Sequence, residues 1–133
     1  MFTLSLILSG CITGNVVRES DYIRIPVSEI NSEMQKYTYN HNGVEIRYFA
    51  MLDFNGEIKV AFDACEVCGG RLGYTQQGNN VVCESCGLSF PVSNLGIENK
   101  GGGCWPSHLD HVVQGEHVLI SEKDIQDGAF HFV

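Results

Sequence analysis

Two Cys-x-x-Cys-Gly segments restrict the possible folds of this chain more than any other feature of its sequence. The first occupies residues 65–69, the second occupies residues 83–87, and residues 70–82 connect them. Such a segment can turn so that both sulfurs point to one side, because the glycine that ends it tolerates a positive φ. Two turns joined by a short hairpin can therefore surround one metal with thiolates. The candidate metal ligands are Cys65, Cys68, Cys83 and Cys86.

This arrangement of thiols is typical of a zinc ribbon or of a rubredoxin-type iron site. Tetrahedral thiolate sites suit both zinc and iron–sulfur chemistry, so the spacing does not select the metal. Backbone N–H groups after the first cysteine of each turn can donate to the sulfurs and spread the thiolate charge. Gly69 and Gly87 give the turns the shape that these bonds need. In an oxidising compartment, two disulfides are the alternative.

A fifth cysteine, Cys104, follows three consecutive glycines at residues 101–103. Glycines allow close approach of the backbone, and their N–H groups suit a cluster or a bound anion, so Gly103 joins the candidate site. Cys104 can replace one of the paired cysteines as a ligand, or act as a nearby redox-active thiol. The alternative is a small buried residue in a glycine-rich loop.

Other candidate site residues lie close to these cysteines in the sequence. Asp63 immediately precedes the first turn, where it can accept hydrogen bonds from the loop backbone. Tyr74 and Phe90 can pack over the site and exclude water, although core aromatic residues would look the same. His108 and His111 are possible additional ligands, and the alternative for both is a solvated loop.

The charge balance and the absence of enzyme motifs limit the function classes. The chain has 16 acidic and 8 basic residues and a net charge of −8. We therefore expect no nucleic-acid partner, because basic groups must neutralise phosphate. No nucleophile with a neighbouring base, phosphate loop or dinucleotide fingerprint stands out. An enzymatic role could rest only on redox chemistry, and a non-enzymatic redox or metal-binding protein is favoured.

The N-terminal segment predicts attachment to a membrane. Residues 1–8 are almost wholly apolar, and Leu8-Ser9-Gly10-Cys11 resembles the lipobox of a lipoprotein. The apolar run is shorter than the roughly 20 residues that span a bilayer, so it suits a signal segment. We expect a signal segment at 1–11, a tether at 12–20 and a single domain at 21–133. Cys11 would then carry a lipid anchor on the extracytoplasmic face of the cell membrane; an ordinary apolar strand is the alternative.

The pattern of strands and turns predicts an α+β domain that is mostly antiparallel β. It would be a small β domain with two Cys-x-x-Cys-Gly knuckles of zinc-ribbon or rubredoxin type and one or two short helices. Asn42-Gly43 predicts a tight hairpin, and a second hairpin is expected between the two cysteine pairs. Ser121 is expected to cap a short helix. We further expect a helical turn within 28–36, a loop over 93–111 and a closing strand over 129–133.

The motifs together resemble the FtrD-like membrane iron–sulfur protein family. The resemblance lies in Val-Ala-Phe-Asp-Ala-Cys-Glu-Val-Cys-Gly at 60–69, Gly-Tyr at 73–74, Val-Cys-Glu-Ser-Cys-Gly at 82–87 and Gly-Gly-Cys at 102–104. It implies an iron–sulfur-containing, membrane-associated protein, linked with high-affinity iron uptake systems. It also implies Cys65, Cys68, Cys83, Cys86 and Cys104 as candidate cluster residues. Trp105 stands where the family usually has asparagine, and its indole could shield the centre or contact a partner.

Three functional hypotheses follow. The first is a membrane-tethered protein that transfers electrons or handles iron for a membrane iron-transport system. Its cofactor would be an iron–sulfur cluster or mononuclear iron, with zinc as the alternative, and its partners would be membrane iron-transport or redox proteins. The second is an interaction module stapled by a structural zinc ribbon. The third is a thiol–disulfide oxidoreductase, which is disfavoured because its Cys-x-x-Cys motif normally begins a helix.

Overall fold

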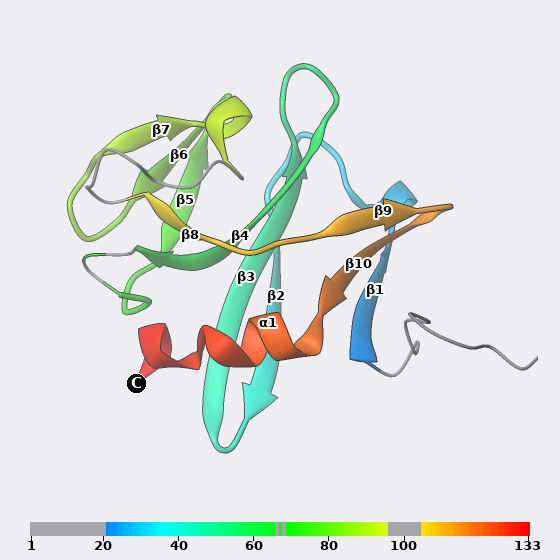
Figure 1. Ribbon diagram of the computed structural model, residues 1–133. Helices are drawn as coiled ribbons and strands as arrows, with labels where there is room; N and C mark the ends of the chain where they lie inside the picture. Colours follow the sequence, from blue (N-terminus) through cyan, green and yellow to red (C-terminus); the bar gives the residue numbers. More distant parts are fainter. Residues whose placement is uncertain (1–20, 66, 68, 96–104) are drawn as a thin grey trace, which may run out of the picture.

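The computed structural model describes residues 21–65, 67, 69–95 and 105–133 of the chain. Within these residues the chain forms ten strands, one short α-helix and several 3-10 turns (Figure 1). All the strand pairs are antiparallel. The predicted fold class, a small and mostly antiparallel α+β domain, is confirmed at this level. The zinc-ribbon description of the cysteine turns stays a prediction.

A four-stranded sheet lies at the centre of the fold. Its strands, in spatial order, are β2 (Gln35–His41), β3 (Val44–Leu52), β4 (Ile58–Cys65) and β8 (Pro106–His108). The turn between β2 and β3 consists of Asn42 and Gly43, whose φ angles are 50° and 80°. Positive φ at both positions is the signature of the type I′ turn, so the predicted hairpin is confirmed.

Strands β3 and β4 are buried on both faces, and the two faces contribute to different cores. Successive side chains of a strand point to opposite faces of its sheet. On one face lie Ile46, Tyr48, Ala50, Val60, Phe62 and Ala64, which belong to the larger apolar core. On the other face lie Phe49, Met51, Ala61 and Cys65, which belong to a second core. The central sheet is therefore the middle layer between two separate cores.

The larger core is covered by a second sheet and by the C-terminal elements. This sheet contains β1 (Tyr22–Pro26), β10 (His117–Ser121) and β9 (Val112–Gln114), in that order. Helix α1 (Glu122–Asp127) follows β10 directly and, with the 3-10 turn η4 (Ala129–Phe132), crosses the central sheet (Figure 1). The Ser121 hydroxyl accepts a hydrogen bond from the Asp124 backbone N–H at 3.5 Å, which confirms the predicted helix cap. Ile125 is the fully buried residue of this helix.

The second core is covered by a small sheet in which the second cysteine turn connects two strands. This sheet is built from β5 (Tyr74–Gln77), β6 (Asn80–Cys83) and β7 (Ser89–Pro91). Strands β5 and β6 form the hairpin that was expected between the cysteine pairs, with Tyr74 opposite Cys83. Two 3-10 turns complete the described elements, η2 (Val27–Glu29) and η3 (Val92–Asn94).

Two expectations about local structure were wrong, and a third was confirmed only in part. Residues 106–108 form strand β8 and not loop, because β4 offers a row of backbone groups that would otherwise be buried without partners. Residues 129–132 form a 3-10 turn and not a strand, because the His131 N–H donates to the Gly128 carbonyl and continues the helical path of α1. The helical turn expected within 28–36 is limited to η2, and Gln35 already begins β2.

Candidate metal centre

The first cysteine turn begins at the end of β4 and closes on itself. The Gly69 N–H donates to the Cys65 carbonyl at 2.9 Å, and the Cys65 N–H donates to the Gly69 carbonyl at 3.0 Å. The Val67 N–H lies 3.2 Å from the Cys65 sulfur, where it can stabilise negative charge on that atom. Gly69 has a φ of 75°, a conformation that glycine adopts without strain. This turn therefore holds a buried sulfur with a backbone donor directed at it.

The second cysteine turn repeats this arrangement at the end of β6. The Gly87 N–H donates to the Cys83 carbonyl at 2.7 Å, and Gly87 also has a φ of 75°. Cys83 is fully buried, whereas Cys86 is exposed. Burial raises the pKa of the Cys83 thiol, while backbone hydrogen bonds from Cys86 and Ser85 act in the opposite direction. A soft metal ion would favour the thiolate here and release a proton on binding.

The first cysteines of the two turns lie in the same buried cluster. Cys65 and Cys83 are 1% and 0% exposed, and both belong to the second core. The Glu84 N–H donates to the Gly73 carbonyl at 3.0 Å, which ties the second turn to the connection that leaves the first. Two thiols far apart in the sequence are therefore placed in one apolar environment.

Asp63 links the central sheet to the hairpin between the cysteine turns. It is 1% exposed, and its Oδ1 accepts a hydrogen bond from the Tyr74 N–H at 2.7 Å. The expected hydrogen bond to the loop backbone is thus present. A Cβ on Gly73 would lie 2.6 Å from the same oxygen, so the hairpin approaches as closely as glycine permits. Because β5 pairs with β6 through Tyr74 and Cys83, this carboxylate helps to fix the position of the second cysteine turn.

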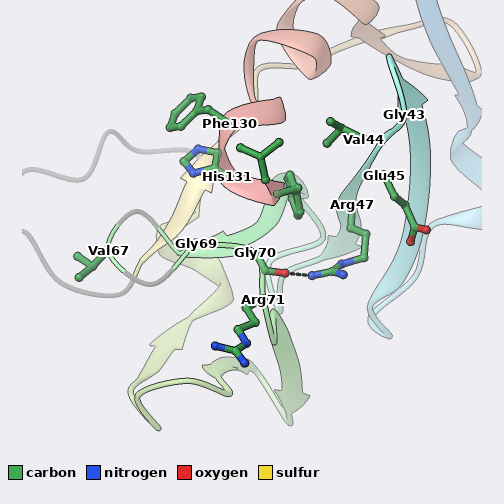
Figure 2. Close-up of a pocket in the computed structure, with 12 residues that line it drawn as sticks. Gly43, Val44, Glu45, Arg47, Val67, Gly69, Gly70, Arg71, Phe130 and His131 are labelled. Carbon is green, nitrogen blue, oxygen red and sulfur yellow. Dashed lines mark hydrogen bonds between the residues drawn. The ribbon is translucent and has the colours of Figure 1, made fainter.

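Arg47 and Lys36 compensate the buried charge of Asp63. Lys36 Nζ lies 3.0 Å and Arg47 Nε lies 3.4 Å from Asp63 Oδ2. Arg47 also donates through Nη2 to the Gly70 carbonyl, immediately after the first cysteine turn (Figure 2). Its guanidinium lies 5.4 Å from the centre of the Phe132 ring. One arginine therefore connects the first cysteine turn, the Asp63 carboxylate and the C-terminal turn.

The sequence patterns did not predict a role for Arg47 or Lys36 at the site. The signal for Arg47 was present in the alternation of β3, where position 47 shares a face with Phe49 and Met51. A cation on an otherwise apolar face requires a buried partner. Asp63, on the corresponding face of β4, was the available carboxylate.

Aromatic residues pack against the cluster that contains the two thiols. Phe90 is 8% exposed, and its ring centre lies 4.5 Å from the ring centre of the half-buried Trp105. Tyr74 is fully buried, with its ring centre 6.4 Å from that of Phe49. Trp105 also packs on this cluster, so the indole covers the thiol side of the domain.

Among the described residues, neither candidate histidine joins the two thiols in a group of three side chains that could hold a metal ion. His108 is in β8 rather than in a solvated loop, and its Nε2 lies 2.5 Å from Asp110 Oδ1. It lines a hollow of about 240 Å³ together with Phe62, a residue of the larger core. His111 is half-buried, and burial lowers its pKa. Direct ligation by either histidine stays a prediction.

Part of the predicted site lies outside the described residues. Those positions are Cys11, Cys68, Gly103 and Cys104. Among the residues that are described, no three histidine, cysteine or acidic side chains converge in a way that could hold a metal ion. The donor chemistry nevertheless fits a thiophilic metal, because two buried thiols share one cluster and backbone N–H groups support them.

The comparison with known families agrees with these features. The profile of the family described as "Membrane iron-sulfur containing protein FtrD-like" matches residues 30–132, nearly the whole chain. The chain belongs to this family, as the motifs around its cysteines predicted. No curated protein sequence matches it. Across the described part of the chain, none of the helices has the length and apolar character needed to cross a membrane.

Proposed function

From membership in the FtrD-like family, we propose that this protein is a membrane-tethered iron–sulfur or iron protein. It would transfer electrons or handle iron for a membrane iron-transport system, on the extracytoplasmic face. The observation that carries this proposal is the burial of Cys65 and Cys83 in one apolar cluster. A structural staple needs only four ligands, whereas this chain adds Cys104 after a run of glycines.

The residues that would hold the group are the thiolates of the two turns, with Cys104 as a further candidate ligand. Such a group, when bound, supplies one-electron redox chemistry whose potential depends on hydrogen bonds to sulfur and on exposure. The chain's own part is to set those conditions. The Val67 N–H supports the Cys65 sulfur, and the packed rings of Phe90 and Trp105 would shield that side from water.

Cys11 supplies the membrane attachment in this proposal. Lipid-modified cysteine would keep the domain within reach of membrane partners without a spanning helix. Mass spectrometry of the membrane-bound protein should detect a diacylglyceryl group on Cys11, and Cys11→Ser should release the protein into the soluble fraction. An unmodified Cys11 in a membrane-bound protein would contradict this part of the proposal.

The functional role is tested by reduction of the purified protein and by iron uptake in cells. The anaerobically purified protein should lose visible absorption on reduction and regain it on reoxidation, in repeated cycles. Cells that depend on this protein should take up less iron at limiting supply when they carry Cys83→Ser, while Phe54→Ala, which alters an exposed side chain, should match the wild type. A colourless protein with stoichiometric zinc, together with normal uptake in the Cys83 variant, would contradict the proposal.

A further inference from the structure

A groove of about 890 Å³ opens beside the first cysteine turn (Figure 2). Three segments that are distant in the sequence form its walls. They are the beginning of β3, the turn residues Val67 and 69–71, and the C-terminal residues 130–133. Because Val67 and Gly69 belong to the first cysteine turn, an occupant of this groove would contact that turn.

Two arginines line the groove, and Arg71 is the one available to a ligand, because Arg47 is already paired with Asp63. Arg47 reaches into it from β3, and Arg71 extends from the loop after Gly70 (Figure 2). Arg71 is exposed and makes no ion pair with the described residues. Its planar guanidinium can therefore receive a carboxylate in a bidentate geometry. Glu45 is the acidic residue of this lining.

Apolar side chains line the same groove and remain in contact with water. Val67 is 71% exposed and Phe130 is 69% exposed. Exposed aromatic and apolar side chains beside arginine are characteristic of protein-binding surfaces, where aromatic residues and arginine provide much of the binding energy. A small carboxylate would use Arg71 alone and leave these walls uncovered.

We propose that this groove is the docking site for a partner protein segment that carries carboxylates beside apolar side chains. Arg71 would pair with a carboxylate of that segment, while Phe130 and Val67 would cover its apolar side chains. The proposal deepens the proposed function, because it places the partner of an electron- or iron-transferring protein against the first cysteine turn. The identity of the partner rests on the proposed function, whereas binding of the segment rests only on the residues that line the groove.

The test uses the metal-loaded protein and a fluorescent capped peptide in which glutamate alternates with leucine and phenylalanine. Fluorescence anisotropy should show saturable binding. Replacing glutamate with glutamine, or the apolar residues with alanine, should weaken binding at least fivefold. Arg71→Gln should weaken it roughly fivefold, as for a charge-assisted pair at a surface. Phe130→Ala should weaken it roughly tenfold, as for an aromatic anchor.

Two matched variants control for general effects of charge and apolar surface. Arg24→Gln removes an exposed arginine on β1, and Phe54→Ala removes an aromatic residue that is 71% exposed on the turn after β3. Both should bind the peptide as the wild type does. Equal binding by Arg71→Gln, Phe130→Ala and the two controls would overturn the proposal.

Two further outcomes would also overturn it. Acetate or citrate that displaces the peptide and binds as tightly as it does would identify a small-anion site. Self-association that Phe130→Ala abolishes would identify a second copy of the chain as the occupant. Metal content and the visible spectrum are measured on the same samples. A zinc protein that binds the peptide contradicts the proposed function alone, and an iron protein that ignores the peptide contradicts the docking site alone.

Discussion

The two faces of the central strands have opposite chemistry. On one face, β3 and β4 contribute aliphatic and aromatic side chains such as Ile46 and Val60, packed against β10 and α1. On the other face, the same strands contribute Asp63, Arg47 and Cys65. Asp63 and Arg47 contact the segment between the two cysteine turns, and Cys65 begins the first turn. The first core needs only apolar burial for its stability. The second contains a buried carboxylate and two buried thiols, groups that lower stability unless they have partners.

This difference suggests a division of labour within one small domain. The apolar face forms a scaffold whose stability does not depend on metal. The thiol face is held in place by the Asp63 contacts, and under the proposed function it would gain further stability from the bound group. Perturbing the two faces should therefore give different responses to metal removal.

The largest expected effect is on the apolar face. Ile46 is fully buried, and Ile46→Ala should lower the free energy of unfolding by about 3 kcal/mol through lost burial and a cavity. Denaturant unfolding should give the same loss with and without metal. Phe54→Ala, on an exposed turn, should change the stability by less than about 0.5 kcal/mol. A loss for Ile46→Ala that vanishes in the metal-free protein would show that the stability of the apolar face depends on metal.

The next effect is on the thiol face. Asp63→Ala removes the acceptor of the Tyr74 N–H and leaves Arg47 and Lys36 without their carboxylate. We expect a loss of about 2 kcal/mol, below the value for a fully buried pair because both cations are partly exposed. Metal should also dissociate faster from this variant in a chelator-competition assay.

The variant Asp63→Asn separates the effect of the hydrogen bond from the effect of the charge. Asparagine can still accept the Tyr74 hydrogen bond but cannot compensate the two cations. It should hold metal better than Asp63→Ala, although less well than the wild type. Identical metal release from all three proteins would show that Asp63 does not position the second cysteine turn.

Local sequence signals predicted the hairpins but not the contacts between distant segments. Asn42-Gly43 allows only a few turn types, so the β2–β3 hairpin could be read directly. Pro106 gave no such signal, because its strand forms only where β4 leaves an edge beside Cys65. The role of Arg47 depends on Gly70 and Phe132, which come from other segments of the chain. The candidate cysteines were evident from their spacing, whereas the residues that orient them required the fold.

The smallest expected effect is the pH response of His111, which is half-buried. Burial lowers its pKa below the usual 6.5, so the unfolded chain takes up the proton first as the pH falls. The stabilising contribution of neutral His111 is complete above the unfolded-state pKa of about 6.5. It is lost as the pH falls through the lower pKa of the folded state. His111→Gln should flatten this part of the stability profile in denaturant unfolding. An unchanged profile would show that His111 does not titrate differently in the folded state.

The central claim is that Cys65 and Cys83 jointly hold an iron-containing group. It is tested most directly by metal analysis and visible spectroscopy of the anaerobically purified protein beside Cys65→Ser and Cys83→Ser. We expect iron and a charge-transfer spectrum in the wild type, and loss of both in each variant while the fold, measured by circular dichroism, is retained. Unchanged iron in either folded variant, or a wild type that contains no iron, would contradict it.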